Sequence, residues 1–159
     1  MKKLMLVMVA VAFSSAVSAQ NFNAGISAGF PSGDASDFST FAIAVDLGYI
    51  FEVSDNFDAG VSTGVLHSFG DEYMGIDFDD HTFLPIAASG RLGLGDSFGL
   101  GADIGYALGL NDGNDGGFYY APRLSYSVSD ALDIIAGYRG VSADGGSWDN
   151  ITIGIEFGL

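Results

Sequence analysis

Apolar residues occupy every second position over eight stretches of the chain, and this alternation constrains the fold more than any other feature. A period of two places successive side chains on opposite faces, as in a β-strand and unlike a helix. In residues 98–110, apolar side chains take the even positions, while glycine, alanine and Asp103 take the odd ones. The eight stretches are Phe22–Phe30, Phe41–Glu52, Phe57–Val65, Leu84–Leu94, Phe98–Leu110, Phe118–Val128, Leu132–Arg139 and Ile151–Leu159.

The charged residues decide which face of these strands meets lipid. No Asp, Glu, Lys or Arg lies on the apolar face of any stretch, and the opposite face is mostly Gly, Ala and Ser. A soluble barrel would instead place a Lys- and Glu-rich face in water. A charge on a lipid face costs about 2–4 kcal/mol near the midplane, so its absence favours an apolar exterior and a small-residue lumen. The lumen face also carries three arginines, Arg91, Arg123 and Arg139.

The connections between the stretches alternate in length. The short ones lie around Ser54-Asp55-Asn56, Gly95-Asp96-Ser97 and Ser129-Asp130. The long ones are Pro31–Ser39, Phe69–His81, Asn111–Gly117 and Ser142–Asp149. Short turns at one end and long loops at the other are typical of an outer-membrane barrel with both termini in the periplasm. We therefore predict an all-β fold, an eight-stranded antiparallel up-and-down transmembrane β-barrel. Pro85 and Pro122, which lack an N–H, are expected near the outer strand ends, at a bulge or the last ladder position.

The first nineteen residues have the features of a secretory signal peptide. Lys2 and Lys3 precede an apolar run, Leu4–Phe13, and small residues end at Val17-Ser18-Ala19. An apolar core of about ten residues is too short for a membrane anchor, which needs about twenty. The predicted organisation is a signal peptide at 1–19 and one outer-membrane barrel domain at 20–159.

Composition excludes some functions. Loss of Lys2 and Lys3 with the signal peptide would change the formal net charge from −15 to −17. This balance argues against a nucleic-acid partner, which needs a basic surface. The chain has no cysteine, so stability must come from backbone pairing and packing. No cofactor or metal site is expected.

Six charged residues are expected to form a structural network inside the barrel. Eight strands leave a lumen just wide enough for side chains, and charges placed there need partners. The alternative is a gated ion path. We expect two of the six nearer the periplasm (Arg91, Glu156), three near mid-height (Asp46, Asp103, Arg123) and one further out (Arg139).

The chain resembles the small outer-membrane β-barrel family that includes OmpX, Ail and the OmpA transmembrane domain. The resemblance rests on the eight stretches, on Phe83-Leu84-Pro85-Ile86, on Gly99–Tyr106 and on the alternating tail Ile151–Phe157. It implies a monomer in the outer membrane of a Gram-negative bacterium, in contact with lipids and lipopolysaccharide. It also implies handling by periplasmic chaperones and the barrel-assembly machinery, although the chain ends Phe157-Gly158-Leu159 and not on an aromatic residue. The expected role is structural and non-enzymatic, with surface interactions through acidic extracellular loops.

Two alternatives remain open: a narrow, low-conductance pore and a lipid A-modifying enzyme. Barrels that resemble PagL or PagP edit lipid A with a serine, a histidine and a carboxylate. His67 lies on the lipid face, but Ser68 points the opposite way and no carboxylate shares that face. His81 follows Asp79 and Asp80 without a nearby serine. The chain is therefore not expected to be an enzyme.

The long connections hold acidic and apolar residues that could contact other molecules. Oxygen-rich segments such as Asn111–Gly116 bind Ca²⁺ in some proteins, but the spacing does not match an EF-hand. A solvated acidic surface is the simpler interpretation, and Ca²⁺ shared with lipopolysaccharide phosphates is the alternative. The apolar residues expected in these loops are Tyr73, Met74, Phe78 and Trp148.

Overall fold

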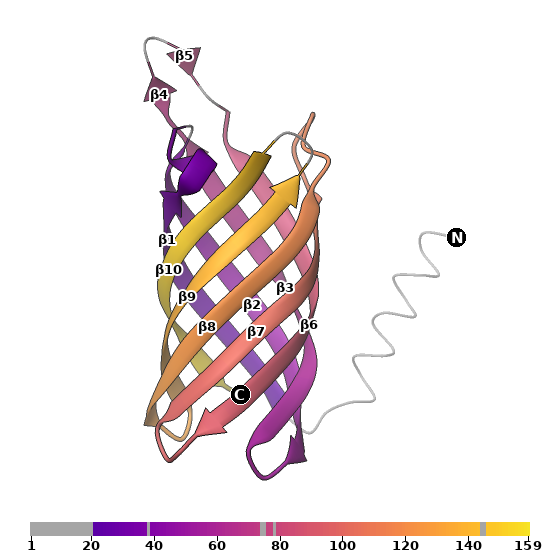
Figure 1. Cartoon of the computed structure of the whole chain (residues 1–159), viewed down its shortest axis with the longest axis vertical. Coiled ribbons are helices and arrows are strands. Elements are labelled where there is room, and N and C mark those ends of the chain that lie inside the picture. Colours follow the sequence, from indigo (N-terminus) through magenta and orange to yellow (C-terminus); the bar gives the residue numbers. More distant parts are fainter. Residues whose placement is uncertain (1–20, 38, 74–75, 78, 144–145) are drawn as a thin grey trace, which may run out of the picture.

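In the computed structural model, the chain from residue 22 forms a closed barrel (Figure 1). The structure describes residues 21–37, 39–73, 76–77, 79–143 and 146–159, so the predicted signal peptide, Met74 and Phe78 lie outside the described residues. Among the described residues, no helix has the length and hydropathy needed to cross a membrane. The barrel strands are β1 (Phe22–Ser32), β2 (Ser39–Ser54), β3 (Phe57–Gly70), β6 (His81–Leu94), β7 (Phe98–Gly109), β8 (Gly117–Ser129), β9 (Leu132–Ala143) and β10 (Gly146–Gly158).

Each strand pairs antiparallel with its neighbours in the order β1-β10-β9-β8-β7-β6-β3-β2, and the pairing of β1 with β2 closes the barrel. Every predicted stretch falls on a separate strand. The predicted fold, an eight-stranded antiparallel up-and-down barrel, is confirmed. A 3-10 helix, η2 (Gly33–Asp37), and a small two-stranded sheet of β4 (Glu72–Tyr73) and β5 (Ile76–Asp77) belong to the longer connections. We call the end that carries them the outer end, and the opposite end the periplasmic end.

The register of the strands fixes the width of the barrel. Following paired residues once around the sheet leads from Phe22 through Tyr49, Val61 and the other strands back to β1 at Ser32. This is a stagger of ten residues over eight strands. Such a stagger tilts the strands by about 40° and leaves an interior that side chains fill.

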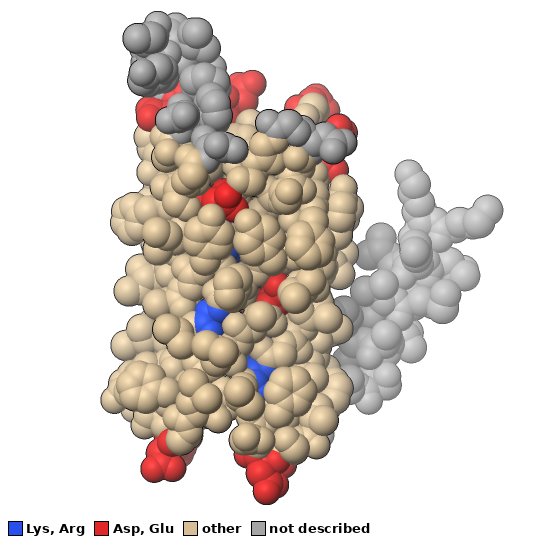
Figure 2. Space-filling view, in the orientation of Figure 1, with Lys and Arg blue, Asp and Glu red and all other residues tan. Residues whose placement is uncertain are grey.

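Large apolar side chains cover the outside of the barrel. Val61, Ile104 and Ile153 are each more than half exposed, as core residues of a water-soluble protein would not be. On the face shown in Figure 2, acidic residues gather at the two ends, and the broad belt between them is mostly uncharged. The few charged atoms visible within this belt lie recessed between uncharged side chains. The belt has the form expected of a surface in contact with hydrocarbon.

Buried apolar side chains gather in the outer half of the interior. The largest of them are Leu66, Phe83, Tyr119 and Val141, each at most 2 % exposed. Inward-facing alanines complete the cluster, and Trp148 packs against it. We call these four large residues the outer apolar layer.

The periplasmic half of the interior contains a polar cavity of about 230 Å³. Asn23, Asp58, Arg91, Asp133 and Glu156 contribute to its lining. This periplasmic cavity lies at the end where the short turns, residues 55–56, 95–97 and 130–131, join the strands. Those turns match the prediction. Gly95 has a φ of 83°, a conformation that favours glycine.

The fourth long connection is shorter than predicted. The sequence suggested a loop over Ser142–Asp149, but β9 continues to Ala143 and β10 begins at Gly146. Trp148 therefore belongs to a strand, and its expected place in a loop is wrong. The alternation does not reveal this extension, because polar Ser147, Asp149 and Asn150 interrupt the apolar pattern.

The two prolines lie within strands and not at bulges, so the prediction for them is wrong. The register of β3 with β6 is the same on both sides of Pro85, and that of β8 with β9 is the same on both sides of Pro122. At each proline, two consecutive residue pairs are missing on one side of the strand. The pairs before and after this gap keep the same register. At Pro85 the hydroxyl of Thr63 donates to the carbonyl oxygen at 2.9 Å and supplies one replacement bond.

Candidate functional site

The outermost of three interior ion pairs joins β9 to β2. Arg139 donates from Nη1 to Asp46 Oδ1 at 2.8 Å and from Nη2 to Asp46 Oδ2 at 2.5 Å. The hydroxyl of Tyr119, a member of the outer apolar layer, also accepts from Arg139 at 3.2 Å. Two parallel hydrogen bonds between a guanidinium and a carboxylate fix the relative orientation of the two groups, in addition to pairing their charges.

The other four predicted residues form two further pairs. Nη2 of Arg123 on β8 donates to both carboxylate oxygens of Glu156 on β10, at 2.6 and 2.8 Å, and Asn23 also donates to Glu156. Arg91 on β6 donates to Asp103 on β7 at 2.7 Å. The structure thus brings all six residues into pairs, and Arg91 and Glu156 also line the periplasmic cavity.

Glycines beside the charged residues make room for these pairs. Asp46 stands opposite Gly64, where an added Cβ would lie 3.0 Å from Asp46 Oδ1. Arg91 stands opposite Gly101, where an added Cβ would lie 2.8 Å from Arg91 Cδ. The glycine-rich inward face is therefore a packing requirement, because a long charged side chain fills the space of its small neighbour.

His67 has a carboxylate partner, contrary to the expectation from the sequence. Its Nε2 lies 3.5 Å from Oδ2 of Asp80, and its Nδ1 lies 2.9 Å from the hydroxyl of Thr82. Asp80 reaches this position because the connection folds back over the strand end, where the Gly70 N–H donates to its Oδ1 at 2.9 Å. Strand alternation cannot place a side chain from a loop. Ser68 points inward and is buried, as predicted.

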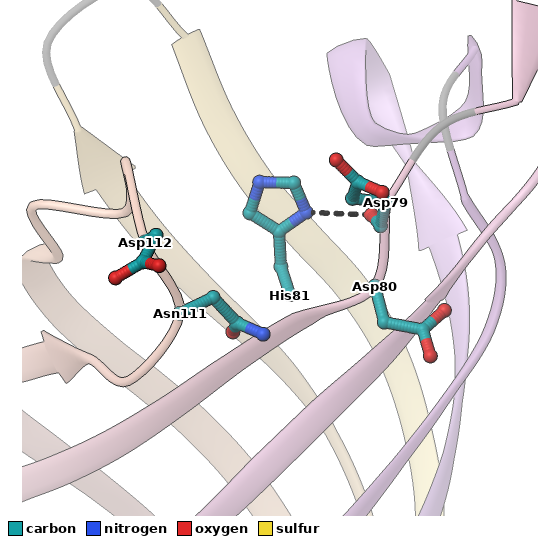
Figure 3. A pocket seen from close by; sticks show the side chains of 5 residues that line it. All are labelled: Asp79, Asp80, His81, Asn111 and Asp112. Carbon is teal, nitrogen blue, oxygen red and sulfur yellow. Dashed lines mark hydrogen bonds between the residues drawn. The ribbon is translucent and has the colours of Figure 1, made fainter.

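His81 and Trp148 meet across the outer mouth of the barrel. Their rings stack with centroids 4.1 Å apart, although they come from β6 and β10. The His81 Nδ1 lies 2.9 Å from the carbonyl oxygen of Asp79. Figure 3 shows the His81 ring between Asp79 on one side and Asn111 and Asp112 on the other, while Asp80 points away from it. These five acidic, amide and imidazole side chains line a cavity of about 580 Å³, which we call the mouth cavity.

A polar cluster around Asp149 on the outer wall was not predicted from the sequence. Asp149 continues the outward face of β10 but is only 7 % exposed. Tyr120 donates to its Oδ1 at 2.9 Å, and the hydroxyl of Ser147 donates to its Oδ2. Tyr120 reaches Asp149 by crossing Gly140, where an added Cβ would lie 2.2 Å from the Tyr120 ring. The one signal in the sequence was Gly140, which lies on the strand between those of Tyr120 and Asp149 and is paired with both residues.

Within the part of the chain that the structure describes, no group of three or more His, Cys, Asp or Glu side chains has the arrangement of a metal site. Residues 34, 37 and 72–78 have side chains outside this description, and they include Tyr73 and part of the acidic set. The candidate features are therefore three: the interior pairs, the cluster of Thr82, His67 and Asp80 at the outer rim, and the mouth cavity.

Comparison with solved structures shows the same fold in small bacterial barrels. The crystal structure of Ail, the attachment invasion locus protein of Yersinia pestis, matches with a TM-score of 0.62 and 14% identity over 86% of this chain and 95% of Ail. Neisserial surface protein A matches with a TM-score of 0.52 and 15% identity, over 87% and 97% of the two chains. A designed transmembrane β-barrel matches with a TM-score of 0.54 and 15% identity, over 88% and 96%. Comparison with curated proteins gives no match.

The family comparison covers nearly the whole sequence. The model described as "Outer membrane protein beta-barrel domain" matches residues 4–159. Together with the closed eight-stranded sheet and its apolar exterior, this confirms the resemblance to small outer-membrane barrels such as Ail. The chain belongs to the outer membrane protein beta-barrel domain family, and its location is the outer membrane of a Gram-negative bacterium.

Proposed function

We propose that this protein is a non-enzymatic structural component of the outer membrane with a filled interior, and that it acts through its acidic extracellular connections. The outer apolar layer carries the proposal. Leu66, Phe83, Tyr119 and Val141 come from four different strands and are almost completely buried in the outer half of the lumen. An interior packed in this way supports a rigid scaffold and opposes a continuous water path.

The six interior charges have a structural role in this proposal. Asp46 and Arg139 join β2 to β9, Arg123 and Glu156 join β8 to β10, and Arg91 joins β6 to Asp103 on β7. Each pair neutralises charges that would otherwise be costly inside the barrel, and together they hold strands from both sides of the lumen.

Conductance in planar bilayers tests the filled interior. A barrel closed by the outer apolar layer is expected to give no unitary current steps at the voltages where a porin control conducts. Reproducible small steps from the purified protein would instead support the narrow pore.

The charge of the outer end determines which partners are compatible with the proposal. Ail has been solved with the heparin analogue sucrose octasulfate, a polyanion. In the present chain the connection at 71–80 contains five acidic residues and no Lys or Arg, and the three arginines are paired inside the barrel. The extracellular connections therefore favour cationic partners, or lipopolysaccharide phosphates bridged by Ca²⁺. Calorimetric titration with Ca²⁺ alone tests the bridge, and absence of heat would remove it.

Biogenesis follows the same proposal. A signal peptide at residues 1–19 would direct export, and periplasmic chaperones and the barrel-assembly machinery would insert the domain at 20–159 as a monomer. The expected result is a mature protein that begins at Gln20 in mass spectrometry of outer membranes. Its mobility in gels would change on heating, as a compact barrel unfolds.

A lipid-modifying enzyme is the second candidate, because the outer rim holds a hydroxyl, an imidazole and a carboxylate in series. Thr82, His67 and Asp80 have the order of groups used in nucleophilic acyl transfer. The 3.5 Å contact to a half-exposed Asp80 is loose, and Thr82 and His67 are simple cross-strand neighbours. Mass spectrometry of lipid A from cells with the wild-type protein or the Thr82→Val variant distinguishes the structural role from the enzyme. Identical lipid A in the two strains supports the structural role. Loss of an acyl chain only in cells with the wild-type protein supports the enzyme.

A further inference from the structure

One glycine on the inner wall of the barrel lies between two carboxylates. Gly25 on β1 is paired with Asp46 on β2 and with Glu156 on β10, so the three residues form a row across adjacent strands. The two carboxylates belong to different interior ion pairs, since Asp46 binds Arg139 and Glu156 binds Arg123. Because glycine has no side chain, the row leaves a space between the two ion pairs.

This space is a small cavity of about 10 Å³, which we call the glycine cavity. Gly25 lines it together with four polar side chains, those of Ser27, Asp46, Arg139 and Glu156. A cavity of this volume has room for about one water molecule. An added Cβ at Gly25 would meet its nearest atoms at 3.4–3.8 Å, which are ordinary contact distances. The glycine cavity therefore differs from the space at the glycines opposite Asp46 and Arg91, which the charged side chain fills.

The hydroxyl of Ser27 points to a ligand in the glycine cavity. Ser27 is only 8 % exposed, and its Oγ is buried without a hydrogen bond to any residue that the structure describes. Buried hydroxyls are ordinarily hydrogen-bonded, because folding removes them from water. Since Ser27 lines the cavity, a ligand there can supply the missing bond.

The two carboxylates at the cavity can each accept a further hydrogen bond. Asp46 accepts two hydrogen bonds from Arg139. Glu156 accepts three, two from Arg123 and one from Asn23. Because a carboxylate has about four acceptor sites, both groups can also accept from a ligand in the glycine cavity.

The charges around the glycine cavity select a neutral ligand. In the two ion pairs, two guanidinium groups balance two carboxylates. A cation in the cavity would be repelled by Arg139, and an anion would be repelled by Asp46 and Glu156. The ligand needs one acceptor for the Ser27 hydroxyl and two donors for the carboxylates. Water meets both requirements and fits the volume.

We propose that the glycine cavity binds one ordered water molecule, which accepts a hydrogen bond from the Ser27 hydroxyl and donates to the carboxylates of Asp46 and Glu156. This inference goes beyond the proposed function. Through this water, the two ion pairs form one network that joins β8 and β10 to β2 and β9, with Ser27 of β1 between them.

The glycine cavity lies between the periplasmic cavity and the outer apolar layer. Glu156 lines both cavities, so water can reach the site from the periplasmic side. On the other side, Arg139 bonds the hydroxyl of Tyr119, a member of the outer apolar layer. The proposed water therefore marks the outer limit of hydration from the periplasm, and a single molecule forms no continuous water path.

Gly25→Ala gives the direct test, because the added methyl group would occupy the glycine cavity without a clash. In NMR spectra of the protein in detergent micelles, magnetisation transfer from water to the β-protons of Ser27 should appear in the wild type and be lost in Gly25→Ala. Absence of this transfer in the wild type would overturn the proposal. Retention of the transfer in Gly25→Ala would also overturn it, because the signal would then come from the Ser27 hydroxyl proton.

The stability of Gly25→Ala is a second test, since a dry cavity and a hydrated one predict opposite signs. Filling a dry cavity and replacing a strand glycine both stabilise a fold. Displacing a bound water instead leaves the Ser27 hydroxyl without a partner. Gly90→Ala on the lipid face is the matched control, because its Cβ would meet the Phe57 ring at an ordinary 3.5 Å. Relative to this control, the unfolding equilibrium constant of Gly25→Ala in urea should rise about three- to tenfold. An equal or smaller constant would contradict the proposal.

Ser27→Ala separates loss of the hydroxyl from loss of the water. In a dry cavity this variant removes an unbonded hydroxyl, and the stability should stay the same or rise. In the hydrated cavity the water loses one of its three partners, so the unfolding equilibrium constant should rise about two- to fivefold. The double variant Gly25→Ala/Ser27→Ala should be more stable than Gly25→Ala, because no hydroxyl is left unbonded. Heat-modifiable gel mobility first confirms that each variant is a folded barrel. Ser27→Ala at least as stable as the wild type would rule out the water.

Discussion

The two halves of the barrel interior solve the same packing problem with different chemistry. Toward the outer end, the lumen holds the four large members of the outer apolar layer, which are almost inaccessible to solvent. Toward the periplasm, the lumen widens into the 230 Å³ cavity, and its walls carry Arg91, Asp58 and Asp133. In the proposed function, the outer half supplies the seal, while the periplasmic half tolerates water and charge. Substitutions in the outer half, at the boundary, on the outer wall and in the periplasmic half test this difference.

The largest effect is expected for Phe83→Ala in the outer half. Phe83 has no exposed surface, and its neighbours come from strands that cannot collapse into the space without breaking the ladder. We expect a loss of about 4–5 kcal/mol in the free energy of unfolding, the upper part of the range for a buried phenylalanine. Urea unfolding in lipid vesicles, followed by gel mobility, measures it. Ile104→Ala on the lipid face is the control, and an equal loss there would show that the outer apolar layer contributes nothing special.

Arg139→Ala tests the boundary between the two halves and is expected to cost about 3 kcal/mol, because it leaves a carboxylate inside the barrel without its partner. Asp46 would lose two hydrogen bonds, and the Tyr119 hydroxyl would lose its donor. The double variant Arg139→Ala/Asp46→Ala should recover part of the loss. If the double variant is as unstable as the sum of the two single variants, the pair makes no coupled contribution.

The alternation of apolar residues was enough to predict the strands and the faces of their side chains. The residues that it misplaced show the limits of such a prediction. Inward-facing residues such as Asp46 and Arg91 could be assigned because a period of two leaves only two faces. The partner of Asp46 could not be assigned, because β9 and β2 are separated by β10 and β1 in the sheet, and Arg139 reaches Asp46 only inside the closed barrel. Pro85 was misplaced for a related reason: ladder pairs on either side hold the register across a missing N–H.

The outer end was the least predictable part. Asp80 reaches His67 through a fold of the connection, and Trp148 reaches His81 across the mouth. Neither contact follows a periodic pattern: the first depends on where the connection after β5 returns to the barrel, and the second joins the outer ends of β6 and β10, which are not paired in the sheet. The extension of β10 to Gly146 was hidden for another reason: Asp149 faces outward yet is covered by Tyr120 and by η2.

Gly140→Ala probes this outer-wall cluster and is expected to cost about 1–3 kcal/mol, the usual range for overpacking. The added methyl group would occupy the space through which Tyr120 crosses β9, so Tyr120 would have to leave Asp149. Tyr120→Phe keeps the ring but removes the same hydrogen bond, and it separates loss of the bond from the steric effect. An alanine variant as stable as the wild type would show that Tyr120 relocates freely and that the cluster does not support the outer half.

The smallest loss is expected for Arg91→Ala, which breaks an ion pair in the periplasmic half. Asp103 would lose its 2.7 Å bond, but it would keep the electrostatic interaction with Arg123. The removed side chain lines the periplasmic cavity, so water can replace its donors, unlike at Arg139 beneath the outer apolar layer. We therefore expect about 1 kcal/mol, below the cost of an unpaired buried charge, because Asp103 keeps Arg123 nearby and water can enter the space of Arg91. Urea unfolding of Arg91→Ala and Arg139→Ala under identical conditions makes the comparison direct. A loss for Arg91→Ala equal to that for Arg139→Ala would mean that water does not compensate charges in the periplasmic half, and the contrast between the two halves would then be one of shape alone.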